Sequence, residues 1–361
     1  MKKMNMLAVV LCFCFSFNVS AQLELPNGSQ KAKVSQRVGI TDISINYSRP
    51  GVKGRDIWGK LVPYGYNNLG FGTANEAPWR AGADENTTIS FSHDVKVEGQ
   101  TVKAGTYGLF VAVFADGKAT IILSHDSNAW GSFFYDKEHD VMRADVPTNS
   151  VSHHELLTYE FNTVTPNSTT VSLIWEKKEI PFTIEVPVST IVLDEFRSTN
   201  SGQLGFNRQN WENMAAYALN NGGDLKEALG WIDGAISGNF YSQKTFNNLA
   251  IKAQILNKMG KTGEYATLMD EAADLANMNQ LNALGYQMLN AKDYDRALMY
   301  FKRNVKNNPT DANVHDSLGE AYKTIGDKEN AVKYLKKSLS LNPPANVKAN
   351  SEKLLKELNA L

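Results

Sequence analysis

Two stretches of the chain, residues 48–59 and 79–83, combine arginine with tryptophan in loops rich in glycine and asparagine. A guanidinium group presents paired donors in one plane, and an indole presents a flat apolar face. This combination binds carboxylates, sugars or peptides. We therefore predict a ligand-binding site made of Arg49, Arg55, Asp56, Trp58, Trp79, Arg80 and Asp84.

The competing hypothesis for these loops is structural. In it, the three arginines form ion pairs with Asp56, Asp84 or Glu85 and so order the loops, while Trp58 and Trp79 plug the open end of the domain. Adjacent carboxylates such as Asp84 and Glu85 also occur in glycosidases, but neighbouring acids in one loop are too common to indicate that chemistry.

His153, His154 and Glu155 form the histidine cluster that comes nearest to a catalytic pattern. On a strand, the two imidazoles would point to opposite faces, so at most one of them could act with Glu155. The sequence has no His-Glu-x-x-His motif, nucleophile elbow, phosphate-binding loop, EF-hand or dinucleotide fingerprint. We therefore predict that these residues lie at a solvated strand end. We predict no catalytic residue, metal site or cofactor. A hydrolase that uses this cluster is the weakest alternative.

The loops belong to a half of the chain whose apolar residues alternate, as at Ile43, Ile45 and Tyr47. Period two places alternate side chains on one face of a sheet, and Asp116-Gly117 is a hairpin signal. The pattern predicts an all-β two-sheet sandwich, jelly-roll-like, with a closed barrel as the alternative. About nine strands are expected, near residues 33–38, 43–47, 87–92, 94–97, 107–114, 119–124, 156–162, 169–176 and 180–186.

Beyond Asp194 the apolar period becomes helical and an internal repeat begins. Gly285, Ala297 and Pro309 recur 34 residues later as Gly319, Ala331 and Pro343. This is the tetratricopeptide period, in which small residues allow two antiparallel helices to approach closely. Two looser units precede this pair, so an all-α solenoid of about four hairpins is expected.

Aligning the four units predicts a peptide-binding groove. Four asparagines align early in the first helix of each unit and would form a ladder that hydrogen-bonds the backbone of an extended peptide. The alternative is that asparagine simply favours helix starts. The predicted groove residues are Asn210, Asn213, Tyr217, Asn247, Gln254, Asn279, Asn282, Tyr286, Asn313 and Asp316.

The N-terminus has the features of a signal peptide. Lys2 and Lys3 precede an apolar run, and Val19-Ser20-Ala21 suits cleavage after Ala21. The run is shorter than the roughly 20 residues that a transmembrane helix needs. Both cysteines lie within it, which removes disulfides and thiolate chemistry from the mature chain. We expect export to the periplasm of a Gram-negative-type bacterium, with secretion as a further destination.

Charge argues against nucleic acid as a partner. Loss of Lys2 and Lys3 reduces the 37 Lys and Arg to 35 against 38 Asp and Glu, a net charge of −3. Without a basic block, the counterion release that drives nucleic-acid binding is missing. The expected organisation is a signal peptide (1–21), a tail (22–30), a β domain (31–187), a linker or bridging helix (188–207), repeats (208–345) and a capping helix (346–361).

Several motifs in the β-rich half resemble the exported bacterial family catalogued as domain of unknown function 2911. The resemblance covers about residues 31–187 and implies a β-rich exported domain with no established reaction or ligand. The chain departs from the shorter family form at residues 67–78, an extended loop. The motifs are Ser48-Arg49-Pro50, Gly54 to Gly59, Trp79 to Ala83 with Thr87-Thr88, Ala104 to Tyr107, Trp130-Gly131 and Leu157-Thr158-Tyr159.

Two functions follow from this organisation. The first is a non-catalytic exported binding or scaffold protein, in which the repeats hold a protein or peptide partner. The second is a β domain that binds a carbohydrate or another small ligand, with hydrolysis as an extension and with the repeats as scaffold. A tryptophan fluorescence change on adding glycans, reversed by Trp79→Ala, would favour the second.

Overall fold

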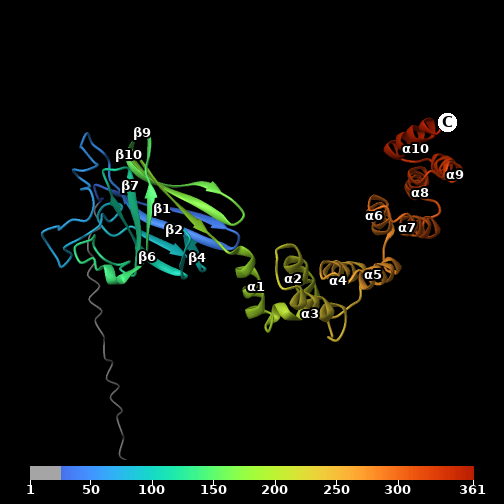
Figure 1. Ribbon diagram of the computed structural model, residues 1–361, viewed down its shortest axis with the longest axis horizontal. Coiled ribbons are helices and arrows are strands. Elements are labelled where there is room, and N and C mark those ends of the chain that lie inside the picture. The colour runs from blue at the N-terminus through green and yellow to red at the C-terminus, as the bar shows by residue number, and fades with distance from the viewer. Residues whose placement is uncertain (1–25) are drawn as a thin grey trace, which may run out of the picture. The chain divides into compact units, whose positions relative to one another are not determined.

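The computed structural model describes residues 26–361, which form two compact units divided at Val188 and Ser189. Each unit is described by itself. The predicted signal peptide lies outside the described residues. The first unit contains strands, and the second contains helices (Figure 1).

The first unit has ten strands within the described residues. Buried side chains alternate with more exposed ones along β2, β3 and β4, as the period-two pattern predicted, whereas β6 and β7 are buried over most of their length. The strands are β1 (Gln30–Val38), β2 (Thr41–Arg49), β3 (Thr88–Phe91), β4 (Val95–Val97), β5 (Gln100–Val102), β6 (Gly105–Val113), β7 (Lys118–Ser124), β8 (Asp140–Pro147), β9 (Asn149–Val164) and β10 (Ser168–Glu185).

Two antiparallel sheets result, which confirms the two-sheet architecture. The larger sheet has the order β1-β2-β3-β6-β7-β8, and the smaller has the order β5-β4-β10-β9. Their buried faces meet where the ring of Tyr47 on β2 lies 4.8 Å from the ring of Tyr159 on β9. The exposed edge strand β1 carries Lys31, Lys33 and Arg37, and charged side chains on an edge oppose pairing with another chain.

The strands differ from the expected ones in several places. β5 and β8 were not among the nine expected strands, and β9 begins seven residues earlier than expected. β8 was not predicted because its apolar positions are few and charged side chains lie between them. β10 is one strand of 18 residues where two were expected. The charged stretch at residues 176–179 looked like a turn, but the structure accommodates it with register shifts against β9 and a left-handed backbone at Glu176 (φ 54°).

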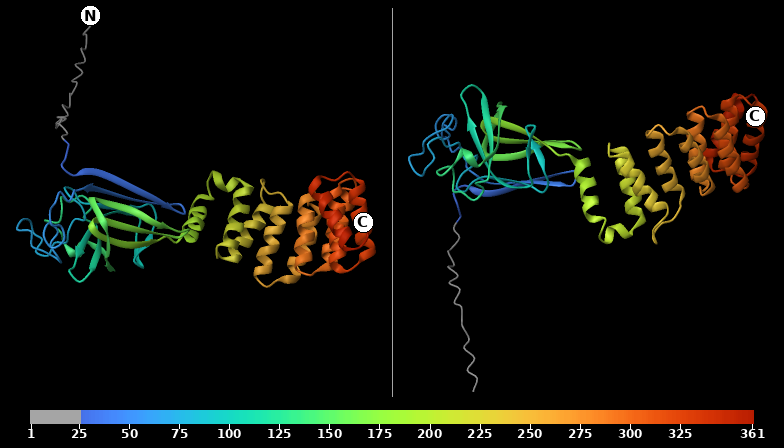
Figure 2. Two further views of the ribbon diagram at one scale, coloured as in Figure 1. Left: turned by 90° about the horizontal axis from the view of Figure 1, so that it is seen from above. Right: turned by 60° about the horizontal axis from the view of Figure 1, so that its bottom comes forward.

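The second unit has ten α-helices within the described residues, and successive hairpins follow one another in chain order (Figures 1 and 2). They are α1 (Val188–Thr199), α2 (Arg208–Asn220), α3 (Leu225–Ile236), α4 (Phe246–Lys258), α5 (Thr262–Asp274), α6 (Met278–Asn290), α7 (Tyr294–Asn307), α8 (Ala312–Ile325), α9 (Lys328–Ser340) and α10 (Ala345–Glu357).

Helix α1 occupies most of the segment that we expected to be a linker. Its Phe196 packs edge-on against Trp211 of α2 and Trp231 of α3, at centroid distances of 5.3 and 5.2 Å. The same cluster contains Leu193, which is 4 % exposed. α1 is therefore a packed part of the helical unit, since burying these apolar side chains is favourable.

Small residues set the spacing within each hairpin. A Cβ atom at Gly285 of α6 would lie 2.5 Å from Phe301 of α7, and one at Gly319 of α8 would lie 2.7 Å from Leu335 of α9. These close approaches explain the recurring glycine of the 34-residue repeat. No helix among residues 26–361 is long and apolar enough to cross a membrane.

Candidate ligand-binding sites

A cavity of about 330 Å³ in the β unit brings together four of the seven predicted ligand-binding residues: Arg55, Trp79, Arg80 and Asp84. We call it the Arg/Trp pocket. Its position follows from the backbone of Trp79, which exchanges two hydrogen bonds with Val111 of β6, at 3.0 and 2.9 Å. The other lining residues are Ser29, Pro50, Leu61, Val62, Gly82, Ala83 and Trp175.

Three tryptophans form one packed cluster beside the pocket. Trp79 stacks on Trp175 with centroids 6.0 Å apart, and Trp58 meets both rings edge-on at 5.9 and 6.1 Å. The Nε1 atoms of Trp58 and Trp175 are buried with no acceptor among the described residues. Trp58 itself does not line the pocket, so its role is to support the two indoles that do.

Hydrogen bonds from neighbouring side chains fix the loop from Trp79 to Asp84. The hydroxyls of Tyr159 and Thr87 both donate to the Ala81 carbonyl, at 2.9 and 3.1 Å. The indole N–H of Trp79 donates to the Gly82 carbonyl at 3.1 Å. Burial raises the pKa of Tyr159 well above its usual range, so its hydroxyl remains a donor.

The three predicted arginines bond to neutral oxygens instead of forming ion pairs. Arg49 donates to the carbonyl of Leu157 and the hydroxyl of Thr158, at 2.9 and 2.6 Å. Arg55 donates to the carbonyls of Gly51 and Val52, at 2.5 and 3.1 Å. Arg80 donates to the carbonyl of Asp84 at 2.5 Å.

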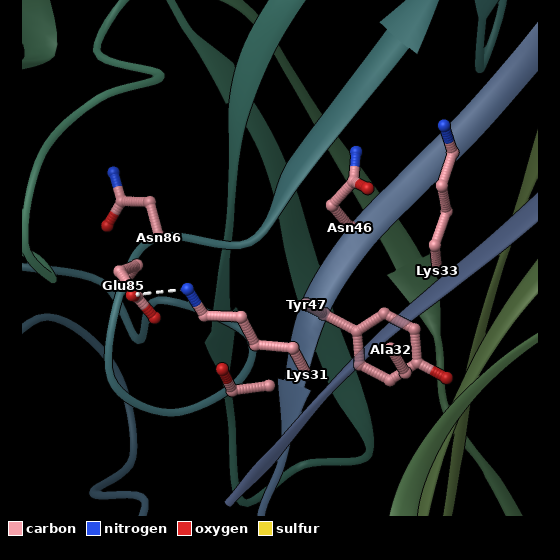
Figure 3. Close-up of a pocket in the computed structure, with 8 residues that line it drawn as sticks. Lys31, Ala32, Lys33, Asn46, Tyr47, Glu85 and Asn86 are labelled. Carbon is pink, nitrogen blue, oxygen red and sulfur yellow. Dashed lines mark ion pairs between the residues drawn. The ribbon is translucent and has the colours of Figure 1, made fainter. Parts of the chain in front are cut away.

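No carboxylate within residues 26–361 lies within ion-pair distance of these three guanidinium groups. Glu85, which the structural hypothesis assigned to an arginine, pairs with Lys31 at 2.8 Å (Figure 3). The ion-pair part of that hypothesis is therefore wrong. The arginines bond to carbonyls because every residue supplies a carbonyl oxygen, and those of the loops lie nearer to the guanidinium groups than the acids do.

Arg80 is half-buried, whereas Arg55 is exposed. Its guanidinium lies 5.4 Å from the centroid of Phe133, and a Cβ atom at Gly131 would lie 2.4 Å from its Cζ. Burial lowers the pKa of Arg80, and the nearby charge of Asp84 partly offsets this. The guanidinium thus lies in a partly desolvated place without a paired carboxylate.

Three predicted residues lie outside the lining, and seven lining residues were not predicted, Trp175 among them. Arg49, Asp56 and Trp58 do not line the pocket, and Arg49 instead ties β2 to β9. Trp175 does line it, although it lies about 100 residues further along the chain. Its place in the alternating pattern of β10 marked it only as a core residue, so the sequence held no signal for this role.

A second cavity of the β unit, about 380 Å³, lies over the start of β1 and was not predicted (Figure 3). Lys33 of β1 and Asn46 of β2 are opposite each other in the strand register and both line it. The Lys31–Glu85 ion pair closes one side. This pair also lowers the pKa of Glu85, through the hydrogen bond from Lys31.

The repeats contain a hollow of about 560 Å³ between α2 and α4, which we call the repeat groove. Gln254, the predicted residue that lines it, lies beside the small side chains of Ala216 and Ala250. The side-chain amides of Gln254 and Asn257 make no hydrogen bond with the described residues. The remaining lining residues are Leu219, Asn220, Ile251 and Lys258.

The helix N-caps establish the register of the repeats. Ala215, Ala253, Gly285 and Gly319 each lie eight residues after the N-cap of their helix, and all four are buried. The predicted alignment of Asn210 with Asn247, Asn279 and Asn313 places Ala216 at this position of the first unit, which is one residue too late. The small residue that packs against the second helix there is Ala215.

This shift changes the predicted asparagine ladder. Asn247, Asn279 and Asn313 each lie two residues after their N-cap, but Asn210 lies three after Asn207, and Gln209 takes the matching position. The amide of Asn210 donates to the Leu204 carbonyl at 2.9 Å. The ladder therefore has a glutamine at its first step.

Two other predicted groove residues of the first unit are displaced with Asn210. Asn213 accepts a hydrogen bond from Gln209 at 3.0 Å. Tyr217 packs against the buried cluster that contains Trp231 and Phe196. Both are one residue past the positions held by Glu212 and Ala216, which follow their N-cap by five and nine residues.

In the last two units, two of the predicted residues, Asp316 and Tyr286, are engaged within the protein. Asp316 is 4 % exposed and accepts hydrogen bonds from Asn350 and Ser351 of α10, so it joins the last hairpin to its cap. Burial raises the pKa of Asp316. Tyr286 donates to Glu320 at 2.8 Å, and Asn282 has its Oδ1 buried without a donor in the described chain.

The histidine cluster lies on β9, where His153 and Glu155 share a face. His153 Nε2 is 3.5 Å from Glu155, whose other oxygen accepts the Lys53 N–H at 2.9 Å. That backbone hydrogen bond lowers the pKa of Glu155. No group of three potential metal ligands occurs in the described part of the chain.

Comparison with known proteins gives matches to both units. A family described as "Protein of unknown function (DUF2911)" matches residues 29–184, and a tetratricopeptide repeat family matches residues 312–344. No curated protein matches the chain.

Several solved structures are similar to part of the chain. MamA AMB-1 is 17% identical, with 42% of this chain and 83% of that chain covered and a TM-score of 0.28. MamA 41-end from Desulfovibrio magneticus RS-1 is 19% identical, with 44% and 88% covered and a TM-score of 0.30. The C-terminal part of a TPR repeat-containing protein from Cytophaga hutchinsonii is 16% identical, with 46% and 73% covered and a TM-score of 0.34.

Proposed function

We propose that the protein is an exported binding protein. Its residues 29–184 belong to the protein family of unknown function DUF2911, and its residues 312–344 are a tetratricopeptide repeat. The repeat groove holds an extended segment of a partner protein. The observation that carries this proposal is the hollow between α2 and α4 with its two unengaged amides, Gln254 and Asn257.

The chemistry of the groove suits a peptide backbone. An extended peptide presents N–H and C=O groups along its length, and a side-chain amide supplies both an acceptor and donors for them. Ala216 and Ala250 leave room for the chain to approach, and Leu219 and Ile251 offer apolar contact for its side chains. Lys258 already donates to the Leu219 carbonyl at 2.6 Å, which leaves the amides as the main polar contacts.

Export to the periplasm is the second part of the proposal. It rests on Lys2, Lys3, the apolar run that follows and the small residues before Gln22. The binding partner is then an envelope protein. The absence of cysteine after residue 21 suits a compartment in which unpaired thiols are oxidised.

A photo-crosslinking experiment tests the groove. The photoreactive residue p-benzoylphenylalanine replaces Gln254 in the full chain in one strain and Thr267 in another, and cross-linked products are identified by mass spectrometry. Thr267 is an exposed residue of α5 outside the lining of the groove. We expect one protein to be captured from position 254 and not from position 267.

A variant that fills the repeat groove is the second part of the cross-linking experiment. Ala250→Arg places a long charged side chain in the hollow, so we expect the product from position 254 to be lost while the helical content of the chain is unchanged. Thr267→Arg is the matched control and leaves the product intact. If positions 254 and 267 capture the same set of proteins, the groove is not the binding site.

A further inference from the structure

The Arg/Trp pocket has a charge that its own residues do not neutralise. Arg55 and Arg80 line it, and neither has an ion-pair partner among residues 26–361. Asp84 is the one acid of the lining, so the lining carries a net charge of +1. A partly buried cation is costly unless an anion approaches it, which makes an anionic ligand favourable here.

The loop from Trp79 to Asp84 contains two residues with unfavourable backbone conformations. Ala81 and Asp84 both have left-handed conformations, with φ values of 51° and 58°. A left-handed backbone is unfavourable for a residue with a side chain, and such residues cluster at ligand sites. Ala81 is fully buried and held by Tyr159 and Thr87, so the surrounding structure imposes the conformation.

The remaining lining defines the shape of the ligand. Trp79 and Trp175 provide an indole wall, and Leu61 and Val62 add apolar surface. Asp84 has its Oδ2 buried with no donor in the described residues, so a hydroxyl or ammonium group that reached it would gain a hydrogen bond. About 330 Å³ is at the small end of ligand pockets and suits one ring or one amino acid.

We propose that the Arg/Trp pocket binds a small carboxylate that carries a neighbouring hydrogen-bond donor and an apolar face. Arg55 and Arg80 contact the carboxylate, Asp84 accepts from the donor, and Trp79 packs against the apolar face. A net charge of +1 matches a monoanionic carboxylate better than a phosphate with a charge near −2. The site is separate from the repeat groove, so either proposal can fail without the other.

Isothermal titration calorimetry on the full mature chain tests the ligand class. The probes are two pairs, D-glucuronate with D-glucose and L-leucine with L-leucinamide, in which the second member lacks the carboxylate. Binding of glucuronate would identify the ligand class as a sugar acid, and binding of leucine would identify it as an amino acid. We expect the carboxylate of one pair to bind at least about tenfold more tightly than its partner, because charged hydrogen bonds are lost with the carboxylate.

Variants of the arginines locate the binding. We expect Arg80→Gln and Arg55→Gln each to weaken the carboxylate by about tenfold or more, while Arg37→Gln has no effect because Arg37 is an exposed residue of β1 outside the pocket. Arg55 is itself exposed, so its variant remains informative if Arg80→Gln unfolds. Equal binding of carboxylate and uncharged partner, binding of neither carboxylate, or unchanged affinity in both arginine variants overturns the proposal.

Discussion

At the scale of single residues, the position of Arg80 depends on a glycine 51 residues further along the chain. Gly131 has a φ of 73°, and a Cβ atom there would overlap the guanidinium group of Arg80. The glycine is thus needed twice, once for its backbone conformation and once for the space that it leaves. Phe133 completes the enclosure from the same loop.

Gly131→Ala is expected to displace Arg80 and to weaken carboxylate binding. A left-handed alanine costs about 1–2 kcal/mol, and the overlap with the guanidinium adds to this. Gly117→Ala is the matched control, because Gly117 has a φ of 85° but nothing within 4 Å of its Cβ position. Urea denaturation and calorimetry check the prediction. Both variants lose stability, and only Gly131→Ala loses affinity; equal affinities would contradict the geometry.

At the scale of elements, the hairpin of β9 and β10 is fastened by one carboxylate. Glu179 accepts hydrogen bonds from Ser172 at 2.6 Å, from Asn149 at 3.0 Å and from Asn162 at 3.1 Å. Two of these donors lie on β9 and one on β10, so a single side chain joins both strands. The hydrogen bonds, that from Ser172 first, lower the pKa of Glu179.

Glu179→Gln is expected to destabilise the protein in a pH-dependent way. The folded pKa of Glu179 lies below its unfolded value of about 4.3, so its contribution is fully present above that pH and is lost as the pH falls through the folded pKa. We expect a loss of about 1 kcal/mol at pH 7, reduced from the usual range because the group is partly solvated. Urea denaturation at pH 7 and pH 3 measures it. A difference that grows on acidification would contradict the sign.

At the scale of the whole molecule, the chain combines two units that each have their own core. The β unit buries Trp175 and Phe110, and the helical unit buries Tyr300 and Phe301. The candidate sites follow this division, since the Arg/Trp pocket lies in the first unit and the repeat groove in the second. The two binding functions can therefore be tested separately on one chain, because a variant in one site leaves the residues of the other site unchanged.

Export is the prediction that concerns the entire chain. Expression with the natural N-terminus in a Gram-negative host should give a periplasmic product that begins at Gln22, because small residues precede the cleavage site. Ala21→Arg should block processing and leave the longer chain. N-terminal sequencing of the fractionated protein measures both, and an unprocessed wild-type chain in the cytoplasm would contradict the assignment.

The sequence alone determined the class of each half. Period-two alternation is a local property, so it showed the sheets, and a 34-residue repeat with small residues at fixed places showed the helical hairpins. It also indicated four lining residues of the Arg/Trp pocket, since arginine and tryptophan in glycine-rich loops are conspicuous. It misplaced the first repeat because two alanines, Ala215 and Ala216, are adjacent, and only packing distinguishes them.

The tertiary structure decided which charges are neutralised and which residues meet. Every residue has a carbonyl oxygen, so the sequence does not show that Arg49 bonds to Leu157, over 100 positions away, in place of a nearby acid. The sequence also does not show that Trp175 lines the pocket. Its place in the alternating pattern of β10 indicates that it is buried, but not which residues lie against it. Burial periodicity is local, whereas a pocket is made of long-range contacts that only the folded chain brings together.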